Sequence, residues 1–243
     1  MITLCLDFGN TRLKAAVFNH DQLREEILLP DGSGDTIASL LDKWKPARSI
    51  LSSVIHHDEA VEQVLSTGTK FHKLSHLTKV NFTSPVGKPE TIGADRLALV
   101  AAAVHFFPGR NNLVIGLGSC ITYNFVNQYH QFLGGSISPG MDMRFRSMHE
   151  FTAKLPLAKA DWNYPLIGYD TRTNLQSGVI TGIACEIDGF IEKYDRKYGN
   201  FNVVLTGGNS AYFASQLKNR IFADYNFLFK GLYALSEINN CNK

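Results

Sequence analysis

The chain has 243 residues, of which 44% are hydrophobic and 19% charged, and its formal net charge is +2. These values are ordinary for a soluble globular protein of one large domain or two smaller ones. So small a net charge provides no broad basic surface, which argues against nucleic acid as the main partner. No segment approaches the ~18–20 uninterrupted apolar residues of a membrane span, so we expect no membrane partner.

Two features of the sequence favour a cytoplasmic protein. The N-terminus lacks the basic start of a secretory signal, and Asp7 interrupts its apolar run. The four cysteines are scattered without CxxC spacing, which is typical of buried thiols in a reducing compartment.

Apolar runs and helical spacing predict strands alternating with helices in the first part of the chain. The predicted strands are 2–6, 13–18 and 49–54, and the predicted helices are 35–44, 58–65 and 94–107. Residues 81–92 contain two prolines and a glycine, which predicts a loop before the last of these helices.

The opening pattern of strand, glycine turn and strand occurs again at residues 113–126. With a constant offset of 109 (116 − 7 = 109), Asp7 corresponds to Gly116 and Gly9 to Gly118. Further predicted elements are strands at 128–133, 135–138 and 202–205, and helices at 182–194 and 211–217.

This repetition predicts a duplicated α/β fold with a cleft between its two halves. The N-terminal half would be residues 1–110 and the C-terminal half residues 111–243.

The first turn combines a carboxylate, a glycine and short polar side chains in Asp7-Phe-Gly-Asn-Thr-Arg-Leu-Lys14. Glycine lets backbone N–H groups approach a phosphate, and a carboxylate at a strand's end suits Mg²⁺. The turn therefore predicts a phosphate cradle beside a metal carboxylate, and a plain hairpin with Asn-Thr turn chemistry explains it equally well. The turn Thr206-Gly-Gly-Asn-Ser210 presents a similar choice, between a nucleotide site at a helix N-terminus and a tight βα turn.

Asp95 lies in Gly93-Ala-Asp-Arg96, at the start of the predicted helix 94–107. A carboxylate held ionised by a helix N-terminus can accept the hydroxyl proton of a phosphoryl acceptor. Arg96 beside it can pair with an acidic substrate. The alternative is a helix cap without a catalytic role, which is the commoner use of an acid in a first turn.

Five motifs in this order resemble the motif series of type III pantothenate kinases. They are Asp7-Phe-Gly-Asn-Thr-Arg-Leu-Lys14, Gly93-Ala-Asp-Arg96, Gly134-Gly-Ser-Ile-Ser-Pro-Gly140, Thr152-Ala-Lys-Leu-Pro156 and Thr206-Gly-Gly208. The resemblance covers nearly the whole chain. It implies an actin-like fold of two duplicated ribonuclease H-like halves, and a homodimer whose active sites lie at the interface.

The resemblance implies ATP-dependent phosphorylation of pantothenate to 4′-phosphopantothenate, the first step of coenzyme A biosynthesis. It also implies Mg²⁺ and a monovalent cation, K⁺ or NH₄⁺. Two alternatives stay open, because the fold alone does not determine the acceptor. One is a kinase for another small alcohol, and the other is a non-catalytic regulatory or binding paralogue.

Site residues follow from the resemblance by position. It implies Asp95 as the proton acceptor and Asp7 as a Mg²⁺ ligand. The implied ATP contacts are Asp7, Phe8, Gly9, Asn10, Thr11, Arg12, Leu13, Lys14 and Ser119. The implied pantothenate contacts are Gly93, Ala94, Asp95, Arg96 and, from the partner side of the interface, Thr171.

The second turn departs from the family pattern Asp-x-Gly-Thr-Ala, whose aspartate helps to bind the monovalent cation. Here the turn reads Gly116-Leu-Gly-Ser-Cys120, and Asn124 stands where the family tends to have another aspartate. Either the enzyme needs no K⁺, or another group compensates, or activity is weakened.

The segment after Gly140 has two readings. Met141, Met143 and Phe145 are of the residue types enriched at interfaces, which favours a dimer contact. Arg144 and Arg146 would reach either a phosphate or solvent, and we favour solvent.

Overall fold

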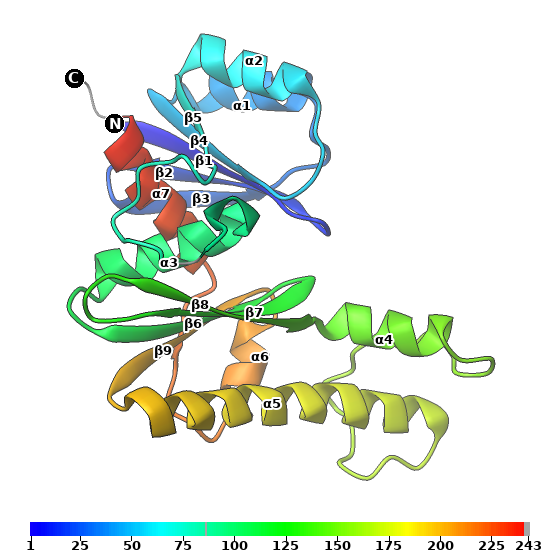
Figure 1. Cartoon of the computed structure of the whole chain (residues 1–243). Coiled ribbons are helices and arrows are strands. Elements are labelled where there is room, and N and C mark those ends of the chain that lie inside the picture. The colour runs from blue at the N-terminus through cyan, green and yellow to red at the C-terminus, as the bar shows by residue number, and fades with distance from the viewer. Residues whose placement is uncertain (86, 241–243) are drawn as a thin grey trace. The chain divides into compact units, whose positions relative to one another are not determined.

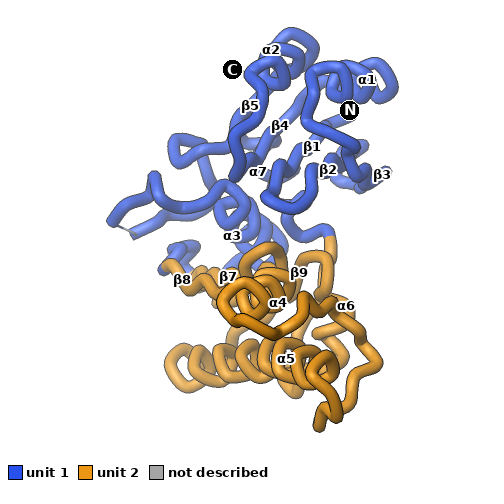
Figure 2. The backbone as a smooth tube through the Cα atoms, turned by 90° about the vertical axis from the view of Figure 1, so that its right-hand side faces the viewer, with its two compact units in different colours: residues 1–109, 129–133, 226–243 blue, residues 110–128, 134–225 orange. Residues whose placement is uncertain are grey.

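The structure is a computed structural model that describes residues 1–85 and 87–240. Strands and helices alternate along the chain, as the sequence predicts (Figure 1). The residues pack into two compact units, which are coloured separately in Figure 2. Unit 1 comprises 1–109, 129–133 and the segment from 226 onward, and unit 2 comprises 110–128 and 134–225. The division into halves at residue 110 stays a prediction.

Unit 1 is built on a five-stranded mixed sheet in the order β3-β2-β1-β4-β5. Its strands are β1 (Ile2–Phe8), β2 (Leu13–Asn19), β3 (Gln22–Leu28), β4 (Arg48–Ser53) and β5 (Lys70–Lys73). β1 pairs antiparallel with β2 and parallel with β4, so the C-terminal ends of β1 and β4 meet at one edge of the sheet. Asp7 and Ser52 lie at this edge and are partners in the β1–β4 register.

Helices cover both faces of this sheet (Figure 1). Helices α1 (Gly34–Trp44) and α2 (Glu59–Gly68) pack with β1, β2 and β4 in one apolar core. Helices α3 (Ala94–Phe106) and α7 (Phe227–Asn239) lie on the opposite face, and the short 3₁₀ helix η1 (Pro89–Thr91) precedes α3. Phe18 of β2 stacks on Tyr233 of α7, which attaches this helix pair to the sheet.

Close packing of α7 on α3 determines where the first turn of α3 lies. A Cβ at Gly231 of α7 would be 1.9 Å from the carbonyl oxygen of Ala98 in α3, and 3.2 Å from the Ala102 side chain. Only glycine permits so close an approach of two helix backbones. The position of Asp95, in the first turn of α3, therefore depends on this contact.

Unit 2 is built on a sheet in the order β10-β9-β6-β7-β8. Its strands are β6 (Asn111–Leu117), β7 (Cys120–Val126), β8 (Phe132–Pro139), β9 (Phe201–Gly207) and β10 (Phe222–Ala223). Its helices are α4 (Met141–Glu150), α5 (Thr171–Tyr198) and α6 (Ser210–Ala214). α5 runs along one face of the sheet (Figure 1), where Ile183 and Ile187 share a buried core with Tyr123 and Phe125. Although α5 has 28 residues, no helix in the described part of the chain is both long and apolar enough to cross a bilayer.

The two sheets share one topology. The order β8-β7-β6-β9-β10 matches β3-β2-β1-β4-β5 strand for strand. In each sheet the central strand pairs antiparallel with the next strand of the chain and parallel with the third strand after it. Asp7 and Gly116 occupy equivalent places near the ends of β1 and β6. The predicted duplication of an α/β unit is confirmed.

Several predicted elements are wrong in extent. The strands predicted at 128–133 and 135–138 are a single strand, β8, which begins only at Phe132, and α5 extends far beyond the predicted 182–194. Glycines at positions 178, 182 and 189 weaken the helical pattern of α5 in the sequence, but tertiary packing stabilises the helix. The half-exposed strand β3 and helices α4 and α7 have no predicted counterpart.

Candidate active site

Asp7 lies near the C-terminal end of β1, at the base of the β1–β2 turn. The Gly9 N–H donates to the carbonyl oxygen of Arg12 at 3.1 Å, which closes the turn. Residues 10–12 are exposed at its tip, whereas Asp7 is half-buried. The apolar members of the motif, Phe8 and Leu13, pack into the unit 1 core. The predicted phosphate hairpin is thus a short exposed turn with a carboxylate at its base.

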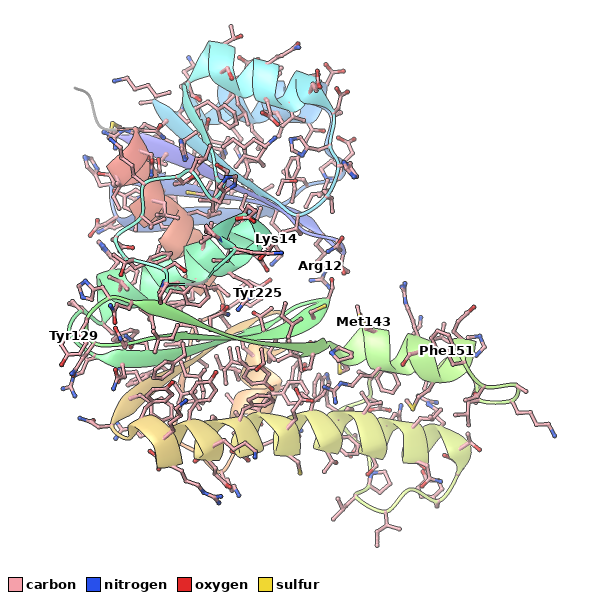
Figure 3. The ribbon with its side chains drawn as sticks, in the orientation of Figure 1. Arg12, Lys14, Tyr129, Met143, Phe151 and Tyr225 are labelled. Carbon is pink, nitrogen blue, oxygen red and sulfur yellow. The ribbon has the colours of Figure 1, made fainter. Side chains whose placement is uncertain are left out.

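Two cationic side chains belong to the same hairpin, and Figure 3 labels both. Arg12 is exposed at the tip. Lys14 is the partner of Asp7 in the β1–β2 register, and its Nζ lies 2.7 Å from Oε1 of Glu26 on β3. Lys14 therefore already has an acidic partner beside the predicted phosphate site.

Asp95 is the second residue of α3, after Gly93 at the N-cap and Ala94 at the first position. Its carboxylate folds back over the start of the helix, since a Cβ at Gly93 would lie only 2.5 Å from Oδ1 of Asp95. The backbone N–H groups of Arg96 and of Asp95 itself donate to this carboxylate. A larger residue at position 93 would displace the carboxylate from this position. The guanidinium of Arg96 lies 5.6 Å from the ring centroid of Phe132.

The carboxyl groups of Asp7 and Asp95 lie within electrostatic reach of each other inside unit 1. Burial raises the pKa of Asp7 to about 7, with a further contribution from the charge of Asp95, while Ser52 and Lys14 oppose the rise. Burial also raises the pKa of Asp95, against the hydrogen bonds from the helix N-terminus. Acids with such shifted pKa values are concentrated at functional sites. The structure therefore brings together the two acids that the motifs single out.

Ser52 belongs to this cluster and was not identified from the sequence. Its side chain is fully buried, and its hydroxyl donates to Oδ1 of Asp7 at 3.2 Å. The sequence feature that could have pointed to Ser52 is the Ser-Ser pair at the end of the predicted strand 49–54. Polar side chains at the C-terminal ends of parallel strands gather at one sheet edge.

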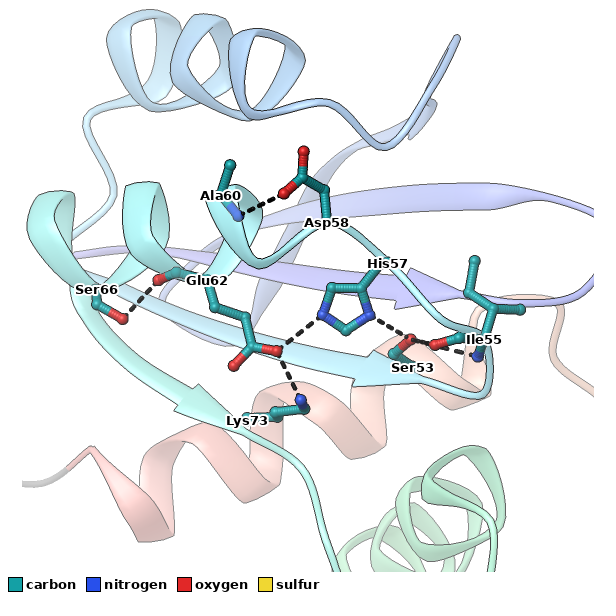
Figure 4. Close-up of polar contacts among 8 residues, drawn as sticks. All are labelled: Ser53, Ile55, His57, Asp58, Ala60, Glu62, Ser66 and Lys73. Carbon is teal, nitrogen blue, oxygen red and sulfur yellow. Dashed lines mark hydrogen bonds and ion pairs between the residues drawn. The ribbon is translucent and has the colours of Figure 1, made fainter.

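The next residue, Ser53, begins a separate chain of polar contacts (Figure 4). Its Oγ lies 3.0 Å from Nδ1 of His57, whose Nε2 lies 2.9 Å from Oε1 of Glu62. Lys73 donates to the same oxygen at 2.6 Å, and this hydrogen bond is the main cause of the lowered pKa of Glu62. His57, Glu62 and Lys73 line a polar surface hollow of about 470 Å³. Each of these four side chains already has a partner within the set. We therefore assign this series of contacts to holding the turn between β4 and α2.

Ser119, the predicted ATP contact of unit 2, lies in the turn between β6 and β7. The Gly118 N–H donates to the carbonyl oxygen of Cys120 at 3.1 Å. The Gly140 N–H donates to the carbonyl oxygen of Ser119 at 3.0 Å, just after the end of β8. The third motif therefore forms most of β8 and fastens its end to this turn.

The positions implied for a monovalent cation carry no carboxylate. Gly116 has Thr122 of β7 and Thr206 of β9 as its register partners. Asn124 is fully buried, and its amide nitrogen donates to the Val114 carbonyl oxygen and to Oγ1 of Thr122, both at 3.2 Å. A glycine and a donating amide do not fit a cation site that needs negatively charged oxygen ligands.

Thr171 is the first residue of α5 and is exposed. A capping box fixes the helix start, because the Thr173 N–H donates to Oδ1 of Asp170 at 2.7 Å and the Asp170 N–H donates to Oγ1 of Thr173 at 3.1 Å.

The predicted helix 211–217 is wrong in extent, since α6 has only five residues. So short a helix makes the Thr206–Ser210 turn a weak anion site.

The segment after β8 corrects two expectations. Met141 and Phe145 are buried in the core of unit 2, so their assignment to a dimer contact is wrong, whereas Met143 is 43% exposed (Figure 3). The guanidinium of Arg144 pairs with Glu186 and does not face solvent, whereas Arg146 is exposed, as favoured.

Known proteins resemble this chain over nearly its whole length. A sequence model of type III pantothenate kinases matches residues 3–193. The type III pantothenate kinase of Christiangramia forsetii is 41% identical over 240 residues, covering 98% of this chain and 99% of that protein. The type III pantothenate kinase of Bacteroides fragilis (strain YCH46) is 38% identical with the same coverage.

Solved structures share the fold at low identity. The structure of a putative Baf family transcriptional activator from Campylobacter jejuni has a TM-score of 0.62 and 20% identity, covering 97% of this chain and 98% of that chain. A putative 2-dehydro-3-deoxygalactonokinase from Sinorhizobium meliloti has a TM-score of 0.51 and 12% identity, covering 97% and 98%. These likenesses concern the fold alone, and they agree with the actin-like α/β fold that the motifs imply.

Proposed function

The chain belongs to the type III pantothenate kinase family, and from this premise we propose that it transfers the γ-phosphoryl group of ATP to pantothenate. The product would be 4′-phosphopantothenate, and the reaction would open coenzyme A biosynthesis. The observation that supports this proposal most strongly is that Asp7, at the base of the β1–β2 turn, lies within electrostatic reach of Asp95 at the start of α3.

Asp95 is proposed as the proton acceptor. The pantothenate hydroxyl attacks the γ-phosphorus of ATP, the bond from that phosphorus to the bridging oxygen breaks, and ADP leaves. Burial raises the pKa of Asp95, so the carboxylate is a stronger base than an exposed one, while the N–H groups at the start of α3 hold its position. In phosphoryl transfer, positioning and charge neutralisation lower most of the barrier.

The β1–β2 turn is proposed as the phosphate cradle. Residues 10–12 at its exposed tip offer hydrogen-bond donors, and Arg12 among them adds a positive charge. Asp7 lies at the base of the same turn. As the family resemblance implies, Ser119 would contribute a further ATP contact, and Arg96 a contact to the pantothenate carboxylate.

The acid pair fits a divalent cation, because burial and the charge of Asp95 oppose the ionisation of Asp7 even with Lys14 nearby, and a bound cation would offset this cost. Asp7 would be the Mg²⁺ ligand on the hairpin side. Bound Mg²⁺ neutralises charge that develops on the phosphate oxygens. A carboxylate-ligated monovalent cation does not fit the described residues around Gly116 and Asn124, and we derive no step through one.

A homodimer is proposed from the apolar surface of unit 2. Phe151, Leu166, Ile167 and Tyr169 are between 73% and 85% exposed. Exposed apolar groups so close together in the chain are typical of a protein–protein contact. Leu166, Ile167 and Tyr169 directly precede Thr171 in the sequence, and a contact through them would bring Thr171 to the active site of the partner. As a metabolic kinase that consumes ATP, the protein is expected in the cytoplasm.

An ATP-consumption assay tests the proposed acceptor. Purified protein would be given pantothenate, or in parallel a set of sugars and short hydroxy acids, under one set of conditions. We expect rapid turnover with pantothenate alone. Faster turnover with another alcohol would make the protein a kinase for that alcohol. Calorimetric binding of pantothenate without turnover would make it a non-catalytic paralogue.

A further inference from the structure

Ser52 is a buried hydroxyl next to a proposed metal ligand. It lies on β4 directly opposite Asp7 in the parallel β1–β4 register, and its side chain is fully buried. Its Oγ donates to Oδ1 of Asp7 at 3.2 Å, which is longer than the about 2.5–3.0 Å usual for an O–H···O hydrogen bond. Bonds at catalytic sites are often long in the free enzyme and tighten in the complex.

The two oxygens of Asp7 face different neighbours. Oδ1 faces Ser52, while Oδ2 lies 4.0 Å from the place that a Cβ would take at Gly9. Oδ2 is therefore the oxygen on the side of the β1–β2 turn. A donor that holds one carboxylate oxygen determines where the other one lies.

We propose that Ser52 is a positioning residue for phosphoryl transfer, whose hydroxyl holds Oδ1 of Asp7 so that Oδ2 faces the metal–nucleotide complex at the β1–β2 turn. This inference rests on the proposed kinase function. The alternative is that Ser52 only fills space at the end of β4, in which case its hydroxyl is dispensable.

The chain provides a matched control one residue away. Ser53 is also a serine at the end of β4, but its hydroxyl donates to the Ile55 carbonyl oxygen at 3.0 Å and contacts His57 (Figure 4). Ser53→Ala therefore disturbs the turn after β4 without removing the contact to Asp7. If the serines only stabilised the end of β4, Ser52→Ala and Ser53→Ala would be expected to weaken Mn²⁺ binding alike.

The test measures metal affinity as well as turnover. Wild type, Ser52→Ala, Ser52→Thr and Ser53→Ala would be titrated with Mn²⁺ in the presence of a non-hydrolysable ATP analogue, with bound Mn²⁺ read by electron paramagnetic resonance. We expect Ser52→Ala to weaken Mn²⁺ binding by at least about tenfold and to lower kcat by a similar factor. Ser52→Thr, which keeps the hydroxyl, and Ser53→Ala should bind Mn²⁺ like the wild type.

Wild-type Mn²⁺ affinity in Ser52→Ala would overturn the proposal, and so would equal losses in Ser52→Ala and Ser53→Ala. If Ser52→Ala fails to fold, Ser52→Cys keeps the volume with only a weak donor and must show the same loss. Failure of the wild type to phosphorylate pantothenate would reject the proposed function, while the Mn²⁺ titration would still report on Ser52.

Discussion

The carboxyl group of Asp7 is held in surroundings that oppose its ionisation when no ligand is bound. Burial and the charge of Asp95 raise its pKa to about 7. Because the pKa is higher in the folded chain than in the unfolded chain, the folded chain binds more protons between about pH 4 and pH 7. The stability of the ligand-free protein should therefore fall as the pH rises through this window.

Asp7→Asn should remove this pH dependence. In the absence of metal and nucleotide, we expect the variant to be more stable than the wild type at about pH 8, by about 2–3 kcal/mol or several degrees in Tm. Below about pH 4 the two should melt alike, because Asp7 is then largely protonated in the unfolded chain as well as in the folded one. Calorimetric melting in the presence of a chelator checks the difference. Asp42→Asn, which changes an exposed acid of α1, is the control, and an unchanged pH slope in Asp7→Asn would contradict the assignment.

The turn at Gly116 leads to a second prediction about single residues. Neither Gly116 nor Asn124 offers a carboxylate, and the Asn124 amide already donates to two oxygens. We expect phosphopantothenate production at the same rate with K⁺, NH₄⁺, Na⁺ or no added monovalent salt. A strong rise with K⁺ would show that another group supplies the missing ligand.

Single residues were predictable where a motif carries them. Asp7 and Asp95 follow from motifs of four to eight residues, and their proximity agrees with the chemistry expected of each. Ser52 did not follow, because nothing local in the sequence pairs β4 with β1. The pairing of Lys14 with Glu26 was also not predictable, since it depends on the unpredicted strand β3.

At the scale of elements, the contact between α3 and α7 links stability to the site. Gly231→Ala would place a methyl group 1.9 Å from the carbonyl oxygen of Ala98. The helices must separate, and we expect a loss of about 1–3 kcal/mol, together with lower activity because Asp95 moves with α3. Thermal melting checks the loss of stability.

Gly189→Ala provides the control for this change. Gly189 lies in α5, and no atom is within 4 Å of the position that its Cβ would take. Alanine there should be neutral or stabilising, by up to about 1 kcal/mol. A Gly231→Ala protein that melts like the wild type would show that the two helices are not in close contact.

Elements with a regular period were the predictable ones. The β1–β2 hairpin, its counterpart in unit 2 and helix α3 follow from apolar periodicity and from turn residues. Helix α4 begins after a glycine and carries mixed polar residues, and its core contacts come from Met141, Phe145 and the partly buried Met148. Such a helix is stabilised by its partners in the fold, which no local pattern reveals.

At the scale of the whole molecule, the proposed dimer predicts that a variant unable to dimerise also loses activity. The double variant Phe151→Asp/Ile167→Asp changes two side chains that are each 85% exposed, so the fold of one chain should persist. We expect wild type to sediment as a dimer and the variant as a monomer with little activity, because Thr171 would no longer reach a partner. Leu77→Asp, at an 81% exposed position of unit 1, is the control and should stay dimeric. A fully active monomer would contradict an interfacial site.

The most direct test of the central claim is mass-spectrometric detection of 4′-phosphopantothenate made by purified wild type and by Asp95→Asn from ATP and pantothenate. The substitution is nearly isosteric and removes the proposed proton acceptor. We expect the wild type to form the product and Asp95→Asn to form it about 10²–10⁴ times more slowly, while melting at least as high as the wild type because a buried carboxyl with a raised pKa is removed. Product formation by Asp95→Asn at the wild-type rate would contradict the role of Asp95, and absence of product from the wild type would contradict the proposed function.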